Sequence, residues 1–442
     1  MALPDRAATL TETLALRALR FRDNPVSAHT AETVRLHALD SFGAILAGAR
    51  TSEGGIVRRA LQSLLGASHA SPAFVAATSA AYARMTEIDD IHLVSCTTPG
   101  SVVFAAAVAG QLAAGDVAVD AAGTCSAILA GYDAMVALGL AADGATTIYA
   151  DIWPTYLGAT ISAAVTAGML LDLPRDQLIH ATAIAASLTN AQTGRVTEDP
   201  SARWITLGLA VQSGLGAALA AQHGIVGDIG LLDRRGETLG LVDAIDASPP
   251  LVSALEQTEL KPYHAGRQSL SAVEAFRALI AEHQLDAADI DAIEVRVPAQ
   301  LRAMIDRPAR PSTRQESRGV RYQLALAALM PERLLDVDRS SLGEDTSGLV
   351  QFSNRVRVVA DDNLTALYPV AWSASVSVEV GGARFERQII SPKGSLGAPM
   401  GERDIVEKLR RVGRLLPQPL PVDELSAAAE ALDLFSVLRL LR

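Results

Sequence analysis

The spacing of hydrophobic residues changes along the chain near residue 245. Before that point apolar residues recur with helical spacing, and some segments are apolar on nearly every side, such as VVFAAAVAGQLAAG (102–115) and AAGTCSAILAGYDAMVALGLA (121–141). A helix that is apolar all round is typical of the buried core of a large protein. Residues 1–262 are therefore predicted to form an all-α domain.

Alternating patterns appear later in the chain. DIDAIEVRVPAQ (289–300), FSNRVRVVADDNL (352–364) and ASVSVEVGGARFERQII (374–390) alternate as half-buried strands do, and the last contains a Gly-Gly hairpin signal. A helical pattern lies between the first two. These elements predict a smaller α+β domain at residues 263–397, with helices at 398–442 that return to the first domain. PSTRQES (311–317) is expected to be a loop. The predicted fold class is mainly α with a smaller α+β domain.

Composition restricts the class of protein. The 442 residues are 49% hydrophobic and 20% charged, which is typical of a globular protein with more than one core. The net charge of −11 argues against nucleic acid or an anionic membrane as a partner. No segment has the ~18 uninterrupted apolar residues of a membrane span, and the N-terminal segment does not resemble a signal peptide. A cytoplasmic location is expected.

Motifs for metal, nucleotide or covalent chemistry are not apparent in the sequence. The two cysteines, Cys96 and Cys125, and the eight histidines show no metal-site spacing, and no phosphate-binding loop or nucleophile elbow occurs. Neither a metal nor a cofactor is expected. The chemistry predicted from the sequence is acid–base catalysis, or binding alone.

Ionisable residues gather in TEIDDIHLVSCTTPG (86–100), immediately before a long apolar helix. Glu87, Asp89, Asp90 and His92 could position and tune a general base. The alternative is a solvated acidic loop after the end of a helix. The motif alone leaves both interpretations open.

Two further segments carry positive charge. In KPYHAGR (261–267), Lys261, Tyr263, His264 and Arg267 could form an anion pocket, although a basic hinge between domains would have the same composition. Arg203 lies where a loop enters a helix, a place where backbone N–H groups also favour anions.

Six segments in order resemble the MmgE/PrpD family, which includes 2-methylcitrate dehydratase, cis-aconitate decarboxylase and iminodisuccinate epimerase. They are ALDSFGAILAGA, IDDIH before a proline, AVQSGLGAALAAQHGIVG, KPYHAGRQSLSAVEAF, GVRYQLALAAL and SPKGSLGAPMGERDIVEKLRRV. The resemblance spans nearly the whole chain. It implies a helical domain, an α+β lid, a site between them and a homodimer.

The resemblance also assigns site residues and exposes departures from the family. Family members carry histidines at the positions of four residues of this chain: Thr98, Trp153, Thr206 and Leu270. Arg203 stands in place of a family lysine. Asp89, Asp90 and His92 match the family, and so do Lys261, Tyr263, Arg267 and the lid-helix Tyr322. Glu87 falls at a position that is acidic in the decarboxylases. Because histidine is well suited to move protons near neutral pH, its loss makes the usual tricarboxylate reaction doubtful.

The resulting hypothesis is a divergent, cofactor-free lyase that acts on a small anionic substrate, not the usual tricarboxylate, in specialised biosynthesis. It would abstract a proton next to an electron-withdrawing group and expel water or phosphate. Asp90 or His92 is the expected base, and Tyr322 is the expected acid or oxyanion donor. Lys261 and Glu87 complete the catalytic set, and the substrate-binding set is Asp89, Thr98, Trp153, Arg203, Thr206, Tyr263, His264 and Arg267. The rivals are an epimerase, isomerase or decarboxylase on the same scaffold, and a binding or scaffold protein without activity.

Overall fold

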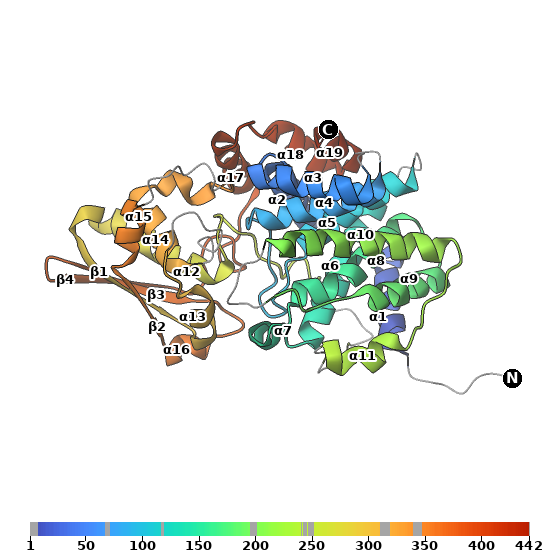
Figure 1. Ribbon diagram of the computed structural model, residues 1–442, viewed down its shortest axis with the longest axis horizontal. Coiled ribbons are helices and arrows are strands. Elements are labelled where there is room, and N and C mark those ends of the chain that lie inside the picture. The colour runs from blue at the N-terminus through green and yellow to red at the C-terminus, as the bar shows by residue number, and fades with distance from the viewer. Residues whose placement is uncertain are drawn as a thin grey trace.

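The computed structural model describes residues 8–66, 71–115, 119–194, 201–239, 241, 245, 252–309, 319–338 and 347–441. Helices make up the larger part of the molecule, at the right of Figure 1, and a sheet with its own helices makes up the smaller part at the left. The predicted fold class, mainly α with a smaller α+β portion, is confirmed. The expected loop at 311–317 lies outside the described residues.

The helical part begins with helices whose ends carry ordinary capping residues. Thr9 and Glu12 form a capping box at the start of the first helix, and Ser27 caps the second. The helices are α1 (Leu10–Asp23), α2 (Ala28–Ala49), α3 (Ser52–Leu65), α4 (Pro72–Met85), α5 (Gly100–Ala114), α6 (Ala121–Ala141), α7 (Gly144–Thr147), η1 (Ile148–Ala150), α8 (Pro154–Leu170), α9 (Arg175–Leu188), α10 (Ala202–Gln222) and α11 (Leu231–Leu239).

The core of this part lies around α5, α6 and α8. Every residue of α8 is buried, and nearly all of α5 and α6 are. Small residues let these helices approach closely: a Cβ on Gly131 of α6 would lie 2.1 Å from Thr166 Oγ1 of α8. The sequence predicted this buried, Ala-rich interior.

The smaller part contains one four-stranded sheet in the order β2-β1-β3-β4. Its elements are α12 (Arg267–His283), η2 (Ala287–Asp289), β1 (Ile290–Val297), α13 (Ala299–Ile305), α14 (Val320–Leu329), η4 (Pro331–Leu335), α15 (Ser347–Ser353), β2 (Val356–Ala360), α16 (Asp362–Thr365), β3 (Ala374–Val380) and β4 (Ala383–Ile389). β1 pairs with β2 in parallel and with β3 antiparallel. β3 and β4 form a hairpin at Gly381 and Gly382, which both have positive φ angles of 55° and 84°.

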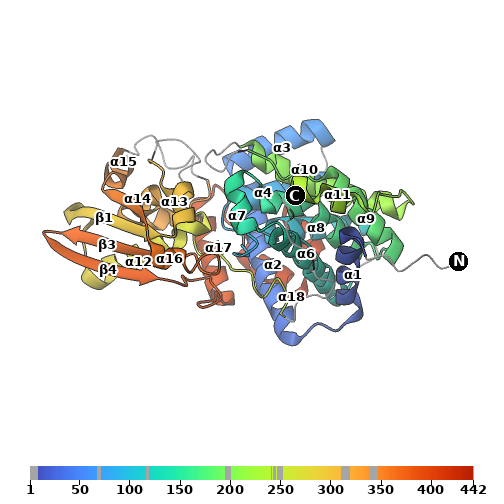
Figure 2. The ribbon, with the colours of Figure 1, turned by 90° about the horizontal axis from the view of Figure 1, so that it is seen from below.

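The C-terminal helices α17 (Glu402–Leu415), α18 (Val422–Ala431) and α19 (Leu434–Leu441) leave the sheet and pack on the helical part near α2, as both views show (Figures 1 and 2). The predicted domain limits at residues 262 and 397 stay predictions.

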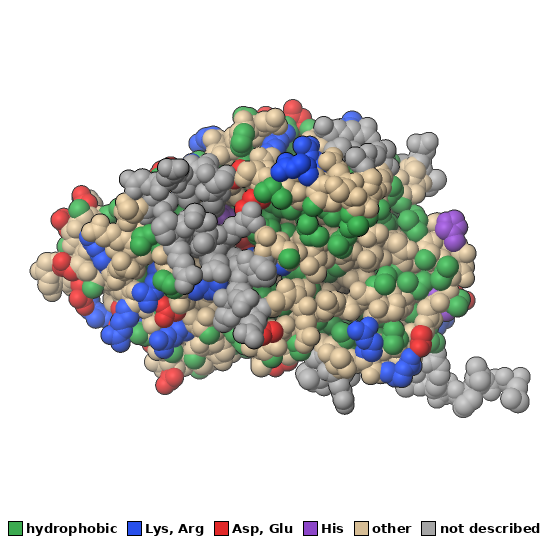
Figure 3. Space-filling view, in the orientation of Figure 1, with side chains coloured by type: hydrophobic (Ala, Val, Ile, Leu, Met, Phe, Trp, Pro, Cys, Tyr) green, Lys and Arg blue, Asp and Glu red, His purple; other side chains and the backbone are tan. Residues whose placement is uncertain are grey.

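Surface character differs between the two parts. On the face seen in Figure 3, charged side chains are spread over the sheet part, whereas hydrophobic side chains gather over the helical part. Two of the described helices, α6 and α10, are long and apolar enough to cross a membrane by length and composition alone. In the most apolar 18-residue stretch of each helix, 94% of α6 and 50% of α10 is buried inside the molecule. Core helices of soluble proteins pass the same test, so these helices are weak evidence for a membrane span.

Candidate active site

The acidic motif forms a buried loop between α4 and α5. Glu87, Asp89 and Asp90 are each at most 3% exposed, so the alternative of a solvated acidic loop is wrong. Ile91 and Glu259 exchange backbone hydrogen bonds of 2.9 and 2.8 Å, which attaches the loop to the segment that leads to Lys261. Glu87 adopts the left-handed backbone region with a φ of 50°, an uncommon conformation for a non-glycine residue that occurs often at functional sites.

Two carboxylates of the loop share three cations. Glu87 lies 2.9 Å from Arg84, 3.1 Å from Arg203 and 3.6 Å from Lys261. Asp89 lies 3.0 Å from Lys261 and 3.4 Å from Arg84. Arg84, Glu87 and Asp89 are close in the sequence, whereas Arg203 of α10 and Lys261 of the segment before α12 reach them only through tertiary folding.

The two carboxylates differ in their pKa. Burial raises the pKa of Glu87, but the charges of Arg84, Lys261 and Arg203 outweigh burial and hold it well below the ordinary value. Burial raises the pKa of Asp89, and this effect outweighs the lowering by the positive charges of Arg84 and Lys261. The negative charge of Glu87 raises the pKa of Asp89 further. Its second oxygen, Oδ2, is buried and accepts no hydrogen bond from the described residues. Glu87 therefore stays ionised while Asp89 more readily takes up a proton.

A fourth cation reaches the site from the smaller part. Arg267 at the start of α12 binds a single oxygen of Glu259, Oε2, with both Nε at 2.8 Å and Nη2 at 2.7 Å. Gly394 supports this region from behind: its φ is 92°, and a Cβ there would lie 2.1 Å from the carbonyl oxygen of Leu260. This close approach explains why glycine is required in the PKGS segment.

Glu87 and the four cations, Arg84, Arg203, Lys261 and Arg267, line a cavity of about 50 Å³ between the two parts of the molecule. Four helices begin at it, since Thr98 precedes α5, Trp153 caps α8, Arg203 lies in the first turn of α10 and Gly266 caps α12. Helix N-termini and cations both favour negative charge. The full lining is Arg84, Glu87, Ile91, Cys96, Thr98, Ile148, Trp153, Pro154, Thr155, Arg203, Lys261, Gly266, Arg267, Gln268 and Met304.

Six of the thirteen site residues predicted from the sequence line this cavity: Glu87, Thr98, Trp153, Arg203, Lys261 and Arg267. Trp153 donates from Nε1 to the carbonyl oxygen of Gly194 at 2.7 Å, and its ring lies 6.0 Å from the Arg203 guanidinium. Thr98 donates its backbone N–H to Thr155 Oγ1 at 3.1 Å. Asp89 lies directly behind Lys261.

The two residues expected to be the base do not line the cavity. Asp90, fully buried, accepts hydrogen bonds from Tyr132 Oη at 2.6 Å and Gly100 N at 2.8 Å, and lies 3.1 Å from His37 Nδ1. His92 Nδ1 accepts from the backbone N–H of Ser95 at 3.2 Å. Burial lowers the pKa of His92 to about 4 despite the charge of Asp90. Asp90 thus bonds to α2 and α6, whereas His92 bonds to Ser95 within its own loop.

The four remaining predicted residues are likewise outside the lining. Tyr322 is buried on α14, and Thr206 donates back to the carbonyl oxygen of Ala202 within α10. Tyr263 contacts Arg277, and His264 contacts the carbonyl oxygen of Thr86 through Nδ1. Tyr263 and His264 thus position the segment that carries Lys261 rather than the cavity itself.

The sequence comparisons agree with this architecture. The model of the MmgE/PrpD N-terminal domain matches residues 12–252, and that of the MmgE/PrpD C-terminal domain matches residues 263–433. The chain belongs to the MmgE/PrpD family. Among the curated proteins compared with the sequence, none gives a match. MmgE/PrpD proteins are generally enzymes such as dehydratases, which supports a dehydratase-like or related activity in general terms.

For this MmgE/PrpD protein, the sequence interpretation missed Arg84 and Glu259. Arg84 is in the last turn of α4, and its spacing of three residues from Glu87 is the one signal that could have indicated the contact. Glu259 lies eight residues before Arg267, with no local motif. Within the described residues no group of three or more His, Cys, Asp or Glu side chains could hold a metal ion.

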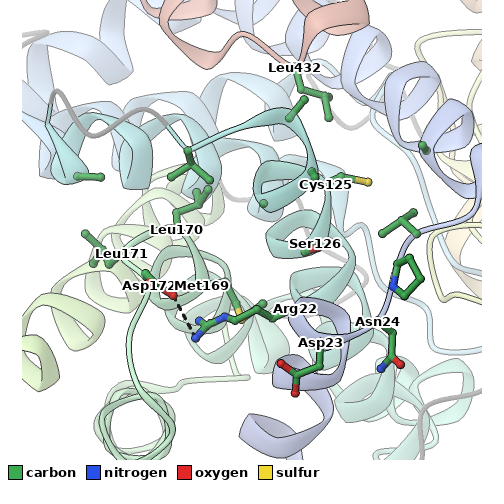
Figure 4. A pocket seen from close by; sticks show the side chains of 18 of the residues that line it. Arg22, Asp23, Asn24, Cys125, Ser126, Met169, Leu170, Leu171, Asp172 and Leu432 are labelled. Atoms are coloured by element: carbon green, nitrogen blue, oxygen red, sulfur yellow. Dashed lines mark hydrogen bonds and ion pairs between the residues drawn. The ribbon is translucent and has the colours of Figure 1, made fainter.

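A larger cavity, about 920 Å³, lies at the other end of the helical part (Figure 4). The ends of α1, α5, α6 and α8 line it, and Arg22 faces Asp172 across 3.2 Å at its side. None of the predicted site residues lies there. The smaller, charged cavity is the candidate active site because acids, cations and helix N-termini meet in it.

Proposed function

We propose that this MmgE/PrpD protein is a lyase that uses no cofactor and eliminates a β leaving group from a small anionic substrate. The observation that carries the proposal is the small cavity lined by Arg84, Arg203, Lys261, Arg267 and Glu87. A scaffold protein without activity would have no need to bury so many charged groups around an internal space. Elimination of water is the simplest reaction of this type, and phosphate is the other leaving group considered.

The cations would bind the carboxylate of the substrate and make the proton on the neighbouring carbon more acidic. A substrate carboxylate placed in the cavity would be within reach of Arg203 and Lys261, which line it. Their charges would stabilise the negative charge that develops when a proton leaves the neighbouring carbon. Glu87 stays ionised and keeps these cations in place. Binding and electrostatic stabilisation are therefore provided by one set of groups.

We assign proton transfer to the Lys261–Asp89 pair. Lys261 Nζ lies 3.0 Å from Asp89 Oδ1, and burial raises the pKa of Asp89, which makes its carboxylate a better proton acceptor. As Lys261 Nζ takes the proton from the substrate carbon, one of its ammonium protons passes to Asp89 Oδ1, so Lys261 carries the same number of protons before and after this step. Lys261 then donates a proton to the departing hydroxyl, which leaves as water, and Asp89 returns its proton to Lys261. This assignment replaces Asp90 and His92, which do not line the cavity.

A panel of β-hydroxy and β-phospho carboxylic acids tests the proposal. Formation of the unsaturated product by the wild type, and a loss of at least about 100-fold in kcat in Lys261→Met, are expected. Lys393→Met is the matched control because Lys393 is a half-exposed lysine of the smaller part that pairs with Asp404. Equal kcat in the wild type and Lys261→Met would remove Lys261 from catalysis.

The same panel in D2O separates the lyase from its main rival. An epimerase exchanges the α proton for deuterium without releasing a product, whereas a lyase forms an unsaturated acid. Deuterium in recovered substrate together with no product would favour the epimerase.

The homodimer and the cytoplasmic location also remain proposals. The protomer mass is 46.2 kDa, so light scattering after size-exclusion chromatography should give twice this mass for a dimer. A mass equal to one protomer over a range of concentrations would exclude the dimer.

A further inference from the structure

We infer that the substrate of this site carries a single anionic group and a short apolar substituent, which makes it a compact monocarboxylate rather than a di- or tricarboxylate. The inference rests on the proposed function for the location of the site. Beyond the proposed function, the inference states how many charged groups the substrate carries and that the rest of the substrate is apolar. Three observations on the cavity lead to it.

The first observation is the size of the cavity. A water-sized group needs roughly 10–15 Å³ of such space, so about 50 Å³ holds about four of them. One carboxylate and the carbon next to it fill this space, so any further carboxylate of a larger acid has to lie outside it.

The second observation is that each cation already contacts a carboxylate of the protein. Arg84 contacts Glu87 and Asp89, Arg203 contacts Glu87, and Lys261 contacts Asp89. Arg267 holds Glu259 through two nitrogens and leaves only Nη1, which points to the carbonyl oxygen of Trp372 at 3.5 Å. The cluster can share its donors with one more anion. It offers no second cation dedicated to a further carboxylate.

The third observation is an apolar wall on the same cavity. It is made of Ile91, Ile148, Trp153, Pro154 and Met304. A carboxylate placed against this wall would lose its hydration without gaining a donor, whereas a methyl group would gain contacts. The wall therefore selects an apolar substituent at the position where a second carboxylate would otherwise bind.

Two acids of matching carbon skeleton test the inference by calorimetric titration of the whole protein. The two acids differ at one end only, where 3-hydroxybutyrate has a methyl group and malate has a second carboxylate. We expect 3-hydroxybutyrate to bind at least about tenfold more tightly than malate, and citrate to bind more weakly than either. Equal or tighter binding of malate or citrate would overturn the inference, and so would the absence of binding by all three.

Trp153→His tests the apolar wall itself. The smaller and polar imidazole should raise the affinity for malate relative to 3-hydroxybutyrate by about tenfold, whereas Trp372→His, a buried tryptophan of the smaller part, should leave the ratio unchanged. An unchanged ratio in folded Trp153→His would contradict the role of the wall. The wild-type comparison needs no variant and decides the inference even where a variant fails to fold.

Binding and turnover separate this inference from the proposed function. Preferential binding of 3-hydroxybutyrate without turnover of any acid in the panel would overturn the lyase and retain the monocarboxylate site. Turnover of malate in preference to 3-hydroxybutyrate would retain the lyase and overturn the monocarboxylate site.

Discussion

Arg203 Nη2 lies 3.1 Å from Glu87 Oε1, and both side chains are 4% exposed. The two residues are 116 positions apart in the sequence and belong to different helices and loops. Their contact joins the acidic loop to the start of α10, and the guanidinium also lies 6.0 Å from Trp153 and 5.7 Å from Trp204. A buried guanidinium placed in this way depends on carboxylates for its stability.

Glu87→Gln should destabilise the protein by about 3–5 kcal/mol, because the buried Arg203 and Lys261 and the largely covered Arg84 lose a carboxylate that they share. Urea unfolding measures the change. The control is Glu294→Gln, which removes a carboxylate from a partly exposed group of ion pairs on β1 and should change the free energy of unfolding by less than about 1 kcal/mol. A loss below about 1 kcal/mol in Glu87→Gln would show that the cations do not depend on Glu87.

Tyr132→Phe should lower stability by about 1–3 kcal/mol, because Asp90 loses a donor at 2.6 Å in a fully buried position. Since Asp90 does not line the cavity, kcat and KM for any substrate identified should stay within about twofold of wild type well below the unfolding midpoint. A shift in the pH profile of kcat would instead return Asp90 to the catalytic groups.

The stability of the protein should fall as pH decreases from about 6.5 to about 4. His92 has a pKa of about 4 in the folded state because of burial, against an ordinary value of 6.5, so the unfolded chain binds its proton more readily in this window. The contribution is complete above pH 6.5 and amounts to ~3 kcal/mol when lost. Urea unfolding of His92→Asn across this range should show a correspondingly smaller slope.

The exposed His29 supplies the control for that measurement. Its side chain is 85% exposed, so His29→Asn should keep the pH dependence of the wild type. Identical slopes in wild type and His92→Asn would contradict a buried, neutral His92.

Lys408 on α17 should matter for both stability and the site. It contacts the buried Asp40 at 2.5 Å and donates to the carbonyl oxygens of Ile88 at 3.1 Å and Lys261 at 2.9 Å. Lys408→Met leaves Asp40, whose pKa burial already raises, without its partner and should cost about 3–5 kcal/mol.

A double variant separates the ion pair from the carbonyl contacts. Asp40→Leu combined with Lys408→Met should recover much of the lost stability, because no buried charge is left alone. The carbonyl contacts stay lost, so KM and kcat of the double variant should remain impaired. Full recovery of both stability and kinetics would show that Lys408 does not position the Lys261 segment.

Much of the fold could be predicted because its signals are local. The helical periodicity, the apolar stretches of α5 and α6, and the Gly381–Gly382 turn each depend on neighbouring residues. Family resemblance added residues that are distant in sequence, such as Arg203 and Lys261, which line one cavity with Glu87. No local pattern could show which way a side chain faces within a loop.

The roles of Asp89 and Asp90 illustrate that limit. They are adjacent in the sequence, yet Asp89 contacts Lys261 beside the cavity while Asp90 binds Tyr132 inside the helical part. Arg84 was not predicted as a site residue, because a single arginine at the end of an Ala-rich helix resembles an ordinary surface residue. Its low side-chain exposure of 12% accompanies the packing of α10 against α4.

Crystals soaked in parallel with 3-hydroxybutyrate and with malate test most directly whether the small charged cavity is the site at which this protein binds its substrate. We predict density for a bound acid in that cavity, with its carboxylate within hydrogen-bond distance of Arg203 or Lys261. A bound acid ordered only in the larger cavity beside Arg22 and Cys125, or none in the small cavity at saturating concentration, would contradict the assignment of the active site.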